Sequence, residues 1–519
     1  MNIYIRTNFS NISGLGHLMR CSRLSLELKK KGYNCIFYLD KPHKLINIKF
    51  QKIYIYENRK KYLNEIEDAK NFCKLTKKIG SGIVILDDYR FNKSWEKYTS
   101  NFHKKIIIFD DLENKDHYAD FIINYNPKNY PLIKYNFTRN KKKNCKFLIH
   151  PEFNILEKKF FVKNKKKDSF FKIIIYIGGG SDQIIVYNLL VELLKNLKNT
   201  KIKFIVIVGP LAKNKSKIIQ LAKKYNSIEC VNNMDGISSY IKDAQIFVGS
   251  AGTAVFETAL FKTPTILISM AQNQETNIFS LEKIGHYIYI DLNDFLNTKK
   301  ISKLIFLLEE NYKRFKVLNK KTKIKINTSG SKKIIDHIFF KKKIIDKKQD
   351  IFLKQKTKKD RLSIRPVNDK DINHYLASRN LEINLTNSIS KKKIKKLDHY
   401  LWWFKTKRKS YVLIKNGSKI LYLYEERLFF MQNIEYKASG WFACSKDCSI
   451  KEILHALNWQ RHKYKKNVKW LSFIKNSNKL SIKLSKYIGW SVVKGKDKAI
   501  DKMKFLLGIK KHKFIFYKR

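Results

Sequence analysis

The sequence predicts an α/β protein with two doubly wound lobes followed by a smaller α+β domain. Short apolar runs alternate with stretches of helical periodicity up to about residue 340, a pattern typical of parallel strands joined by helices. A Lys-rich stretch then interrupts the alternation, and a different segment follows it. With 519 residues, the chain is also too long for a single hydrophobic core.

The first lobe is expected over residues 1–160. The apolar run Asn2–Arg6 predicts its first strand. The stretch His17–Lys31 has apolar residues at helical spacing and ends at Gly32, so a helix is expected there. Further strands are predicted at Asn34–Leu39, Ile83–Leu86, Lys105–Phe109 and Phe121–Asn124.

The second lobe is expected over residues 161–340, so that residues 1–340 form two Rossmann-like lobes facing a cleft. Its predicted strands are Lys172–Ile177, Lys203–Val208, Ile246–Gly249 and Thr265–Ser269. Residues 341–360 are interpreted as a Lys-rich linker, and residues 361–519 as the α+β domain. The tail Lys510–Arg519 is expected to be a last strand or a frayed end.

The net charge is strongly positive, with 108 Lys plus Arg against 44 Asp plus Glu, or +64. Nucleic-acid binding is one interpretation. However, the basic residues are spread along the whole chain, Lys far outnumbers Arg, and no zinc, helix-turn-helix or RNP signature is present. We therefore favour a codon bias and expect no nucleic-acid partner, although the charge should favour anionic ligands.

The cysteines and the hydropathy indicate a reduced cytoplasmic protein. The seven cysteines are odd in number and irregularly spaced, so no disulfide framework is implied. No signal peptide opens the chain, and no apolar run is long enough to span a bilayer. A cytoplasmic location without a membrane span is therefore predicted.

The first motif with chemical content follows the first strand. It runs from Arg6 through the glycines of Gly14-Leu15-Gly16 to His17 and Arg20. Glycines let a ligand approach the backbone, and His17 falls at a helix N-terminus that attracts anions. An imidazole at the carboxyl end of a strand is well placed to act as a general base, whereas a lone His elsewhere is more often structural.

Carboxylates follow two further strands of the first lobe. Asp87 and Asp88 come directly after a predicted strand, with Tyr89 next to them. They either orient His17 and bind sugar hydroxyls or cap a helix, and the sequence favours neither alternative. For Asp110 and Asp111, which follow the next strand, helix capping is the preferred interpretation.

The second lobe carries two turns of small residues. Gly178-Gly179-Gly180-Ser181-Asp182 follows one strand, and its backbone N–H groups suit a diphosphate, although no Gly-Lys-Ser/Thr completes a Walker motif. Gly249–Glu257 follows another strand and places a carboxylate one helical turn along, where it can accept both ribose hydroxyls. Asn273 and Gln274 add amide groups after the next strand.

Together these motifs resemble the UDP-2,4-diacetamido-2,4,6-trideoxy-β-L-altropyranose hydrolases of pseudaminic acid biosynthesis, over about residues 1–340. That family is similar in fold to the GT-B glycosyltransferases and holds UDP in its second lobe. The resemblance implies that His17 is the general base and that Tyr89 and Asn273 are active-site hydrogen-bonding residues. It further implies contacts to substrate or UDP from a larger set: Arg6, Gly16, Arg20, Gly180, Ser181, Gly252, Thr253, Glu257 and Gln274.

The C-terminal domain more weakly resembles the GNAT-type N-acetyltransferases. Its cues are the run Leu362–Val367, Arg379-Asn380, Trp402-Trp403-Phe404 and Gly489-Trp490. Acetyl-CoA is therefore a candidate cofactor of this domain. The corresponding stretch Ser445–Ile450 lacks the glycines that would bind its pyrophosphate, which argues against acetyl transfer.

The function expected from the sequence is hydrolysis of a UDP-linked 2,4-diacetamido-2,4,6-trideoxy sugar to the free sugar and UDP. The alternative is a GT-B glycosyltransferase, in which a sugar hydroxyl replaces water. No metal and no cofactor are required for the hydrolysis, because no Asp-x-Asp-type site is placed to bridge the diphosphate. Glycine N–H groups, a helix dipole and nearby Lys residues can substitute for a metal. The expected partner is the UDP-sugar, and other enzymes of the sugar pathway are candidate partners.

Overall fold

A computed structural model gives the arrangement of these elements. It describes residues 1–8, 15–40, 52–55, 64–127, 135–156, 169–232, 237–271, 274–320, 322–340, 361–388, 391–446, 448–463, 468–509 and 514–518. The chain divides into two compact units, residues 1–345 and 346–519, and each is considered by itself. The predicted linker over residues 341–360 lies outside the described residues.

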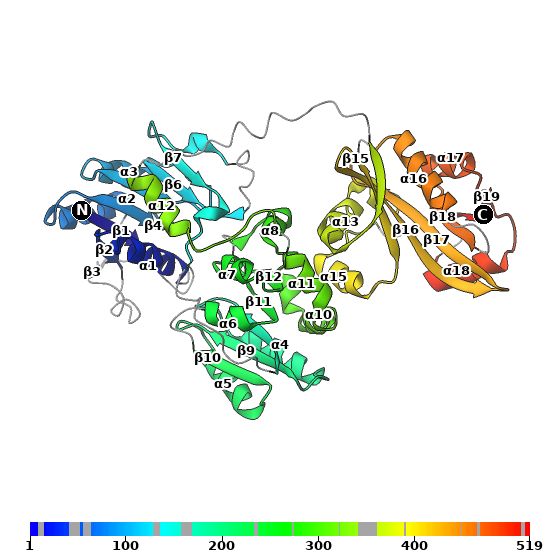
Figure 1. The fold of residues 1–519 in the computed structure, drawn as a ribbon, viewed down its shortest axis with the longest axis horizontal. Coiled ribbons are helices and arrows are strands. Elements are labelled where there is room, and N and C mark those ends of the chain that lie inside the picture. The colour runs from blue at the N-terminus through cyan, green and yellow to red at the C-terminus, as the bar shows by residue number, and fades with distance from the viewer. Residues whose placement is uncertain are drawn as a thin grey trace. The chain divides into compact units, whose positions relative to one another are not determined.

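The first lobe is built on a seven-stranded parallel sheet with the order β3-β2-β1-β4-β5-β6-β7 (Figure 1). Its strands are β1 (Asn2–Thr7), β2 (Asn34–Leu39), β3 (Lys52–Ile55), β4 (Ile83–Asp87), β5 (Lys105–Phe109), β6 (Phe121–Asn124) and β7 (Lys146–Ile149). Its helices are α1 (Gly16–Lys29), α2 (Glu65–Lys77) and α3 (Lys93–Ser100).

Alternate residues of these strands enter two different cores. Ile3 and Ile5 of β1 pack with Leu18 and Leu24 of α1 on one face. Tyr4 of β1 packs with residues of α2 and α3 on the other face. A sheet buried on both faces explains why the strand sequences are nearly all apolar.

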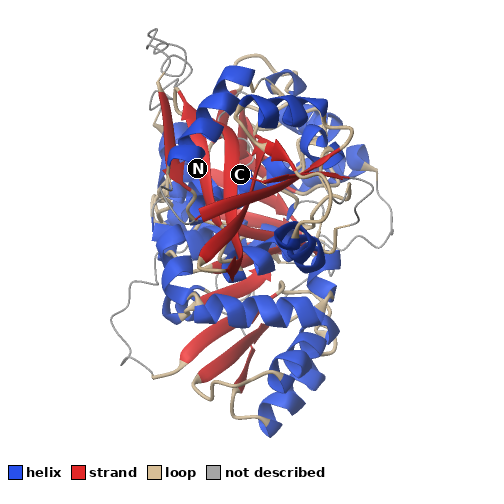
Figure 2. Ribbon diagram, turned by 90° about the vertical axis from the view of Figure 1, so that its right-hand side faces the viewer, coloured by secondary structure: helices blue, strands red, loops and turns tan. Residues whose placement is uncertain are grey.

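The second lobe has a six-stranded parallel sheet with the order β10-β9-β8-β11-β12-β13. Its strands are β8 (Phe171–Tyr176), β9 (Ile202–Val208), β10 (Ile228–Asn232), β11 (Ile246–Ser250), β12 (Thr265–Ser269) and β13 (Ile288–Asp291). Its helices are α4 (Ile184–Lys195), α5 (Lys215–Lys224), α6 (Ser238–Asp243), α7 (Ala254–Phe261), α8 (Ile278–Ile284), α9 (Leu292–Leu296), α10 (Thr298–Glu310) and α11 (Tyr312–Lys320). Helices flank the strands in Figure 2. In both lobes, therefore, the expected α/β architecture with two Rossmann-like sheets is confirmed.

The helix α12 (Gly330–Phe339) follows the second lobe in sequence but contacts the first. The Phe339 ring lies 4.4 Å from the ring of Tyr33, and the Lys105 Nζ donates to the Ile338 carbonyl at 3.1 Å. In Figure 1, α12 appears among the blue elements of the first lobe. The first lobe therefore includes this helix as well as the expected N-terminal residues.

The C-terminal unit contains a mixed seven-stranded sheet with the order β14-β15-β16-β17-β18-β20-β19, in which only β17 and β18 pair in parallel. Its strands are β14 (Leu362–Pro366), β15 (Lys409–Lys415), β16 (Ser418–Met431), β17 (Ile434–Ala443), β18 (Val468–Lys475), β19 (Ser491–Val492) and β20 (Phe514–Lys518). Its helices are α13 (Ile372–Arg379), α14 (Glu382–Thr386), α15 (Lys396–Lys405), α16 (Ile450–His462), α17 (Lys479–Tyr487) and α18 (Lys498–Leu507). The expected α+β class is confirmed, and the tail forms a strand. No helix in the described parts of the chain has the length and apolar content needed to cross a bilayer.

A buried histidine links α3 to the loops after β5. The His117 Nδ1 lies 2.7 Å from the Glu96 Oε1, and its Nε2 lies 3.7 Å from Asp110. Burial opposes protonation, but the nearby carboxylates of Asp110 and Glu96 outweigh it and raise the pKa of His117 to about 9. Because the pKa of a free histidine is about 6.5, the folded state binds the proton more tightly than the unfolded state.

The stability from this site should be fully present below about pH 6.5 and be lost as the pH rises through about 9. It amounts to roughly 3 kcal/mol at most. We therefore expect His117→Gln to destabilise the chain more at pH 6 than at pH 10, measured by urea denaturation. His103→Gln is the control: burial lowers the pKa of His103 to about 4, so the folded ring is neutral at both pH values and its replacement should not destabilise the chain more at pH 6 than at pH 10. An equal effect of His117→Gln at both pH values would contradict the assignment.

Candidate functional site

The carboxyl ends of the parallel strands of both lobes meet around a cavity of about 260 Å³. In doubly wound folds ligands bind at this edge of the sheet. The first lobe contributes Leu15, Gly16, His17, Met19, Arg20, Arg23, Tyr89, Asp111, Tyr125, Asn126 and Pro127. The second lobe contributes Tyr176, Gly178, Gly179, Gly209, Pro210, Ile237, Ser250–Glu257, Gln274, Thr276 and Leu281.

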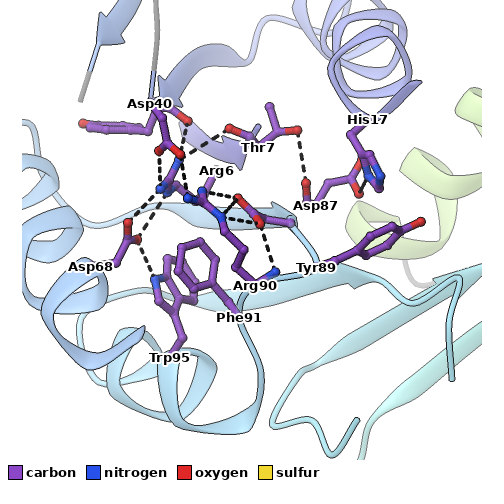
Figure 3. A network of polar contacts seen from close by, with 12 residues as sticks. Arg6, Thr7, His17, Asp40, Asp68, Asp87, Tyr89, Arg90, Phe91 and Trp95 are labelled. Atoms are coloured by element: carbon purple, nitrogen blue, oxygen red, sulfur yellow. Dashed lines mark hydrogen bonds and ion pairs between the residues drawn. The ribbon is translucent and has the colours of Figure 1, made fainter. Parts of the chain in front are cut away.

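His17 lies in the first turn of α1 and is held by Asp87 at the end of β4. The His17 Nδ1 is 2.6 Å from the Asp87 Oδ1. Asp87 is fully buried, and its carbonyl accepts a hydrogen bond from the Thr7 hydroxyl at 3.1 Å. A carboxylate can only accept, so Nδ1 carries the proton and the lone pair lies on Nε2. Figure 3 shows Asp87 directed toward the His17 ring.

Arg20, on the next turn of α1, donates two hydrogen bonds to the Asp87 carboxylate. Its Nε donates to the Asp87 Oδ2 at 2.6 Å and its Nη2 to the Oδ1 at 2.5 Å. The guanidinium also lies 2.7 Å from Asp111 and 3.3 Å from the hydroxyl of Tyr125. Although burial alone would raise it, the pKa of Asp87 is held well below its usual range by Arg20 and His17. Asp87 is therefore ionised at neutral pH.

Tyr89 completes this group of side chains. Its hydroxyl donates to the Asp111 Oδ2 at 2.7 Å, and its ring meets the His17 ring edge-on at 4.4 Å between centroids. The His17 imidazole is thus fixed by a hydrogen bond on one edge and by an aromatic ring beside it. Such a constellation orients one imidazole nitrogen for proton transfer.

The second lobe presents backbone and small side chains to the cavity. Gly252 and Thr253 stand directly before α7, where free N–H groups and the helix dipole favour an anion. Gly178, which has a φ of 110°, and Gly179 lie at the end of β8 beside Gly209. None of the described residues that line the cavity is a lysine, so the neutralising Lys expected from the sequence is absent from this lining.

Glu257 is 2% exposed and lines the cavity from the first turn of α7. Its Oε1 accepts a hydrogen bond from the Arg23 Nη2 at 3.0 Å. Arg23 belongs to α1, so this buried ion pair joins the two lobes. The ion pair supplies the partner that a carboxylate in an apolar helix requires.

The structure brings together most residues predicted for the site. The cavity lining includes His17, Tyr89, Gly16, Arg20, Gly252, Thr253, Glu257 and Gln274. Asn273 and residues 9–14 of the first motif lie outside the described residues.

Three predicted residues are not part of the lining. Arg6 is buried in the first lobe, where its guanidinium lies 2.7 Å from both Asp40 and Asp68 (Figure 3). It therefore has a structural partner set away from the cavity. Gly180 and Ser181 are also outside the lining, and the Ser181 hydroxyl donates to the Ile177 carbonyl at 2.6 Å.

The sequence analysis missed Arg23, Tyr125 and Tyr176 and misassigned Asp111. No helix starts after β5, and Asp111 binds Arg20 and Tyr89, so the capping interpretation is wrong for this residue. For Asp87, the orienting alternative agrees with the geometry. The spacing Arg20-x-x-Arg23 offered a signal, because residues three apart on a helix are neighbours on its surface, so both cations lie near His17.

Comparisons with known proteins match this division into lobes. The family model "Glycosyltransferase family 28 C-terminal domain" matches residues 174–338. An uncharacterized protein of Methanocaldococcus jannaschii is 26% identical over 423 residues, covering 78% of each chain. A Helicobacter pylori protein described as a pseudaminic acid cytidylyltransferase and UDP-2,4-diacetamido-2,4,6-trideoxy-β-L-altropyranose hydrolase is 22% identical over 280 residues. That match covers 53% of this chain and 45% of the Helicobacter protein.

Solved structures resemble the chain at low identity. MurG of Acinetobacter baumannii is 10% identical with a TM-score of 0.45, and the match covers 65% of this chain and 99% of MurG. A complex of S. aureus MnaA with UDP is 9% identical with a TM-score of 0.45, and covers 66% of this chain and 96% of MnaA. None of the comparisons described here names an acetyltransferase, so the GNAT resemblance of the C-terminal unit stays a prediction.

The close approach of Gly209 to Gly179 yields a test of the cavity wall. A Cβ on Gly209 would lie 2.3 Å from the Gly179 Cα, whereas a Cβ on Gly16 would meet nothing within 4 Å. We expect Gly209→Ala to lower the free energy of unfolding by about 2–3 kcal/mol. Gly16→Ala, which also alters the cavity lining, should change it by less than about 0.5 kcal/mol. Urea denaturation of both variants checks this, and equal stabilities would refute the packing argument.

Proposed function

We propose that residues 1–340 cleave the bond between UDP and the anomeric carbon of a UDP-linked sugar, with His17 as the general base. The observation that carries this proposal is the His17–Asp87 pair on the wall of a cavity whose opposite wall is the start of α7. The first element supplies a base, and the second supplies an anion site. The match of residues 174–338 to a glycosyltransferase domain supports a nucleotide-sugar ligand.

In this mechanism Asp87 accepts a hydrogen bond from the Nδ1–H of His17 and stabilises the imidazolium that forms when Nε2 takes a proton from the incoming hydroxyl. The deprotonated oxygen attacks the anomeric carbon, and the C–O bond to UDP breaks with inversion. The leaving diphosphate is received by the backbone N–H groups around Gly252 and Thr253 and by the α7 dipole. Glu257 is placed to accept the ribose hydroxyls.

The nucleophile separates two candidate reactions. The glycosyltransferase domain model favours a sugar hydroxyl, and hence transfer to an acceptor. The Helicobacter relative, whose description includes a UDP-sugar hydrolase, favours water. Both reactions use the same base and the same leaving group. Because the domain model covers nearly the whole second lobe, the transfer reaction is our first proposal, and hydrolysis of the 2,4-diacetamido-2,4,6-trideoxy sugar is the second.

The role of Asp87 can be tested apart from general damage to the fold. We expect Asp87→Asn to lower kcat/KM for UDP release by roughly 10²- to 10⁴-fold, because a neutral amide no longer stabilises the imidazolium. The control is Asp88→Asn. The Asp88 carboxylate binds Arg90 at 2.6 Å and is not among the residues lining the cavity. Similar losses in both variants would argue against the base assignment.

Product analysis distinguishes transfer from hydrolysis. Purified protein is incubated with UDP-2,4-diacetamido-2,4,6-trideoxy-β-L-altropyranose, with and without monosaccharide acceptors, and products are followed by NMR. Transfer should make UDP release acceptor-dependent and link the sugar to the acceptor with inverted configuration. Acceptor-independent release of free sugar would select hydrolysis. Equal UDP release by His17→Ala and wild type would contradict both.

A further inference from the structure

We propose that Arg23 is a positioning residue that holds Glu257 for recognition of the nucleotide ribose, so that a helix of the first lobe sets the ribonucleotide preference of the second. This inference rests on the proposed UDP-sugar function. Neither the sequence motifs nor the family match, which covers residues 174–338, includes Arg23. Its place in the cavity wall, beside Glu257, identifies it.

Arg23 stands where three segments meet. It lies in the second turn of α1, its Nη2 donates to the Glu257 Oε1 of α7 at 3.0 Å, and its Nη1 lies 3.4 Å from the carbonyl of Ile155. Ile155 belongs to the stretch that leads out of the first lobe. Arg23 is 9% exposed, so its guanidinium is enclosed by these groups. This enclosure fixes the direction from which the cation meets the Glu257 carboxylate.

The surroundings of Glu257 make that cation necessary. The other buried residues of α7 are Ala254, Val255, Phe256, Thr258 and Ala259, which offer a carboxylate little solvation. In such a setting a carboxylate without a positive neighbour takes up a proton and becomes a weaker acceptor. The Arg23 guanidinium, 3.0 Å from the Glu257 Oε1, is that positive neighbour, and the carboxylate can then form charge-assisted hydrogen bonds with two vicinal hydroxyls.

A different role for Arg23 makes a different prediction. If the guanidinium instead contacted the diphosphate directly, its loss would weaken every UDP analogue equally, whatever the sugar ring carries. If Arg23 acts through Glu257, its loss should affect only the part of the affinity that depends on the ribose hydroxyls. The comparison of UDP with 2′,3′-dideoxy-UDP therefore separates positioning from phosphate binding.

The experiment measures both affinities by calorimetry for wild type, Arg23→Met and Glu257→Gln in the full chain. Wild type should bind UDP roughly 10- to 100-fold more tightly than 2′,3′-dideoxy-UDP, because the dideoxy ligand lacks both hydroxyls that donate hydrogen bonds to the carboxylate. Both variants should reduce this preference to about threefold or less. Their affinity for 2′,3′-dideoxy-UDP should stay within about threefold of the wild-type value. Arg23→Lys, which keeps the charge, should restore part of the preference.

Three outcomes would overturn the inference: a full UDP preference in Arg23→Met, a loss shared equally by both ligands, or a full preference in Glu257→Gln. Failure of the wild-type protein to bind UDP would instead contradict the proposed function itself. The matched control is Arg365→Met, which breaks an Arg–Asp pair of 2.7 Å in the C-terminal unit, and should leave both affinities unchanged. Thermal unfolding of Arg23→Met shows whether the variant is folded, and Arg23→Lys provides the second test if it is not.

Discussion

The buried carboxylate of Asp87 is the interaction on which the first lobe's site depends. It is fully buried at the end of β4, yet it holds His17 and Arg20 through hydrogen bonds of 2.5–2.6 Å. An isolated charge in that position would be costly, so the buried carboxylate requires the Arg20 guanidinium that neutralises it. Arg20 in turn engages Asp111, and Asp111 engages Tyr89, so one carboxylate organises side chains from the ends of several elements.

The second constraint is that the two lobes share a core. Apolar residues of α1 and β1 belong to the same buried cluster as Val255, Phe256 and Leu281 of the second lobe. The Tyr125 ring meets the Phe256 ring edge-on at 5.2 Å. The cavity therefore lies over a packed interface, and helix α12 returns to the first lobe to extend that packing. Close packing of this kind limits how far either wall can move without the other.

Nine strands of the two parallel sheets could be predicted from the sequence because each is a short apolar run between turn residues, as in Ile83–Asp87, whereas β3, β7, β10 and β13 were missed. The positions of His17, Gly252 and Glu257 on one cavity followed from the rule that strand carboxyl ends share an edge. The partners did not follow from it. Arg6 stands in the same motif as His17, but its neighbours Asp40 and Asp68 come from two other segments. Local pattern identifies the functional element, whereas the pairing of charges is decided by tertiary contacts far apart in sequence.

The net charge of +64 gives a misleading picture of the cavity. Its described lining holds two arginines, Arg20 and Arg23, and each is already bound by carboxylates. A diphosphate in this cavity would therefore meet no unengaged guanidinium or ammonium group on that lining. Its negative charge would instead be stabilised by the N–H groups of the glycine turns and of the start of α7. Such donors are fixed by the backbone and need no reorganisation as charge moves onto the leaving group, which is the arrangement that favours a transition state over a ground state.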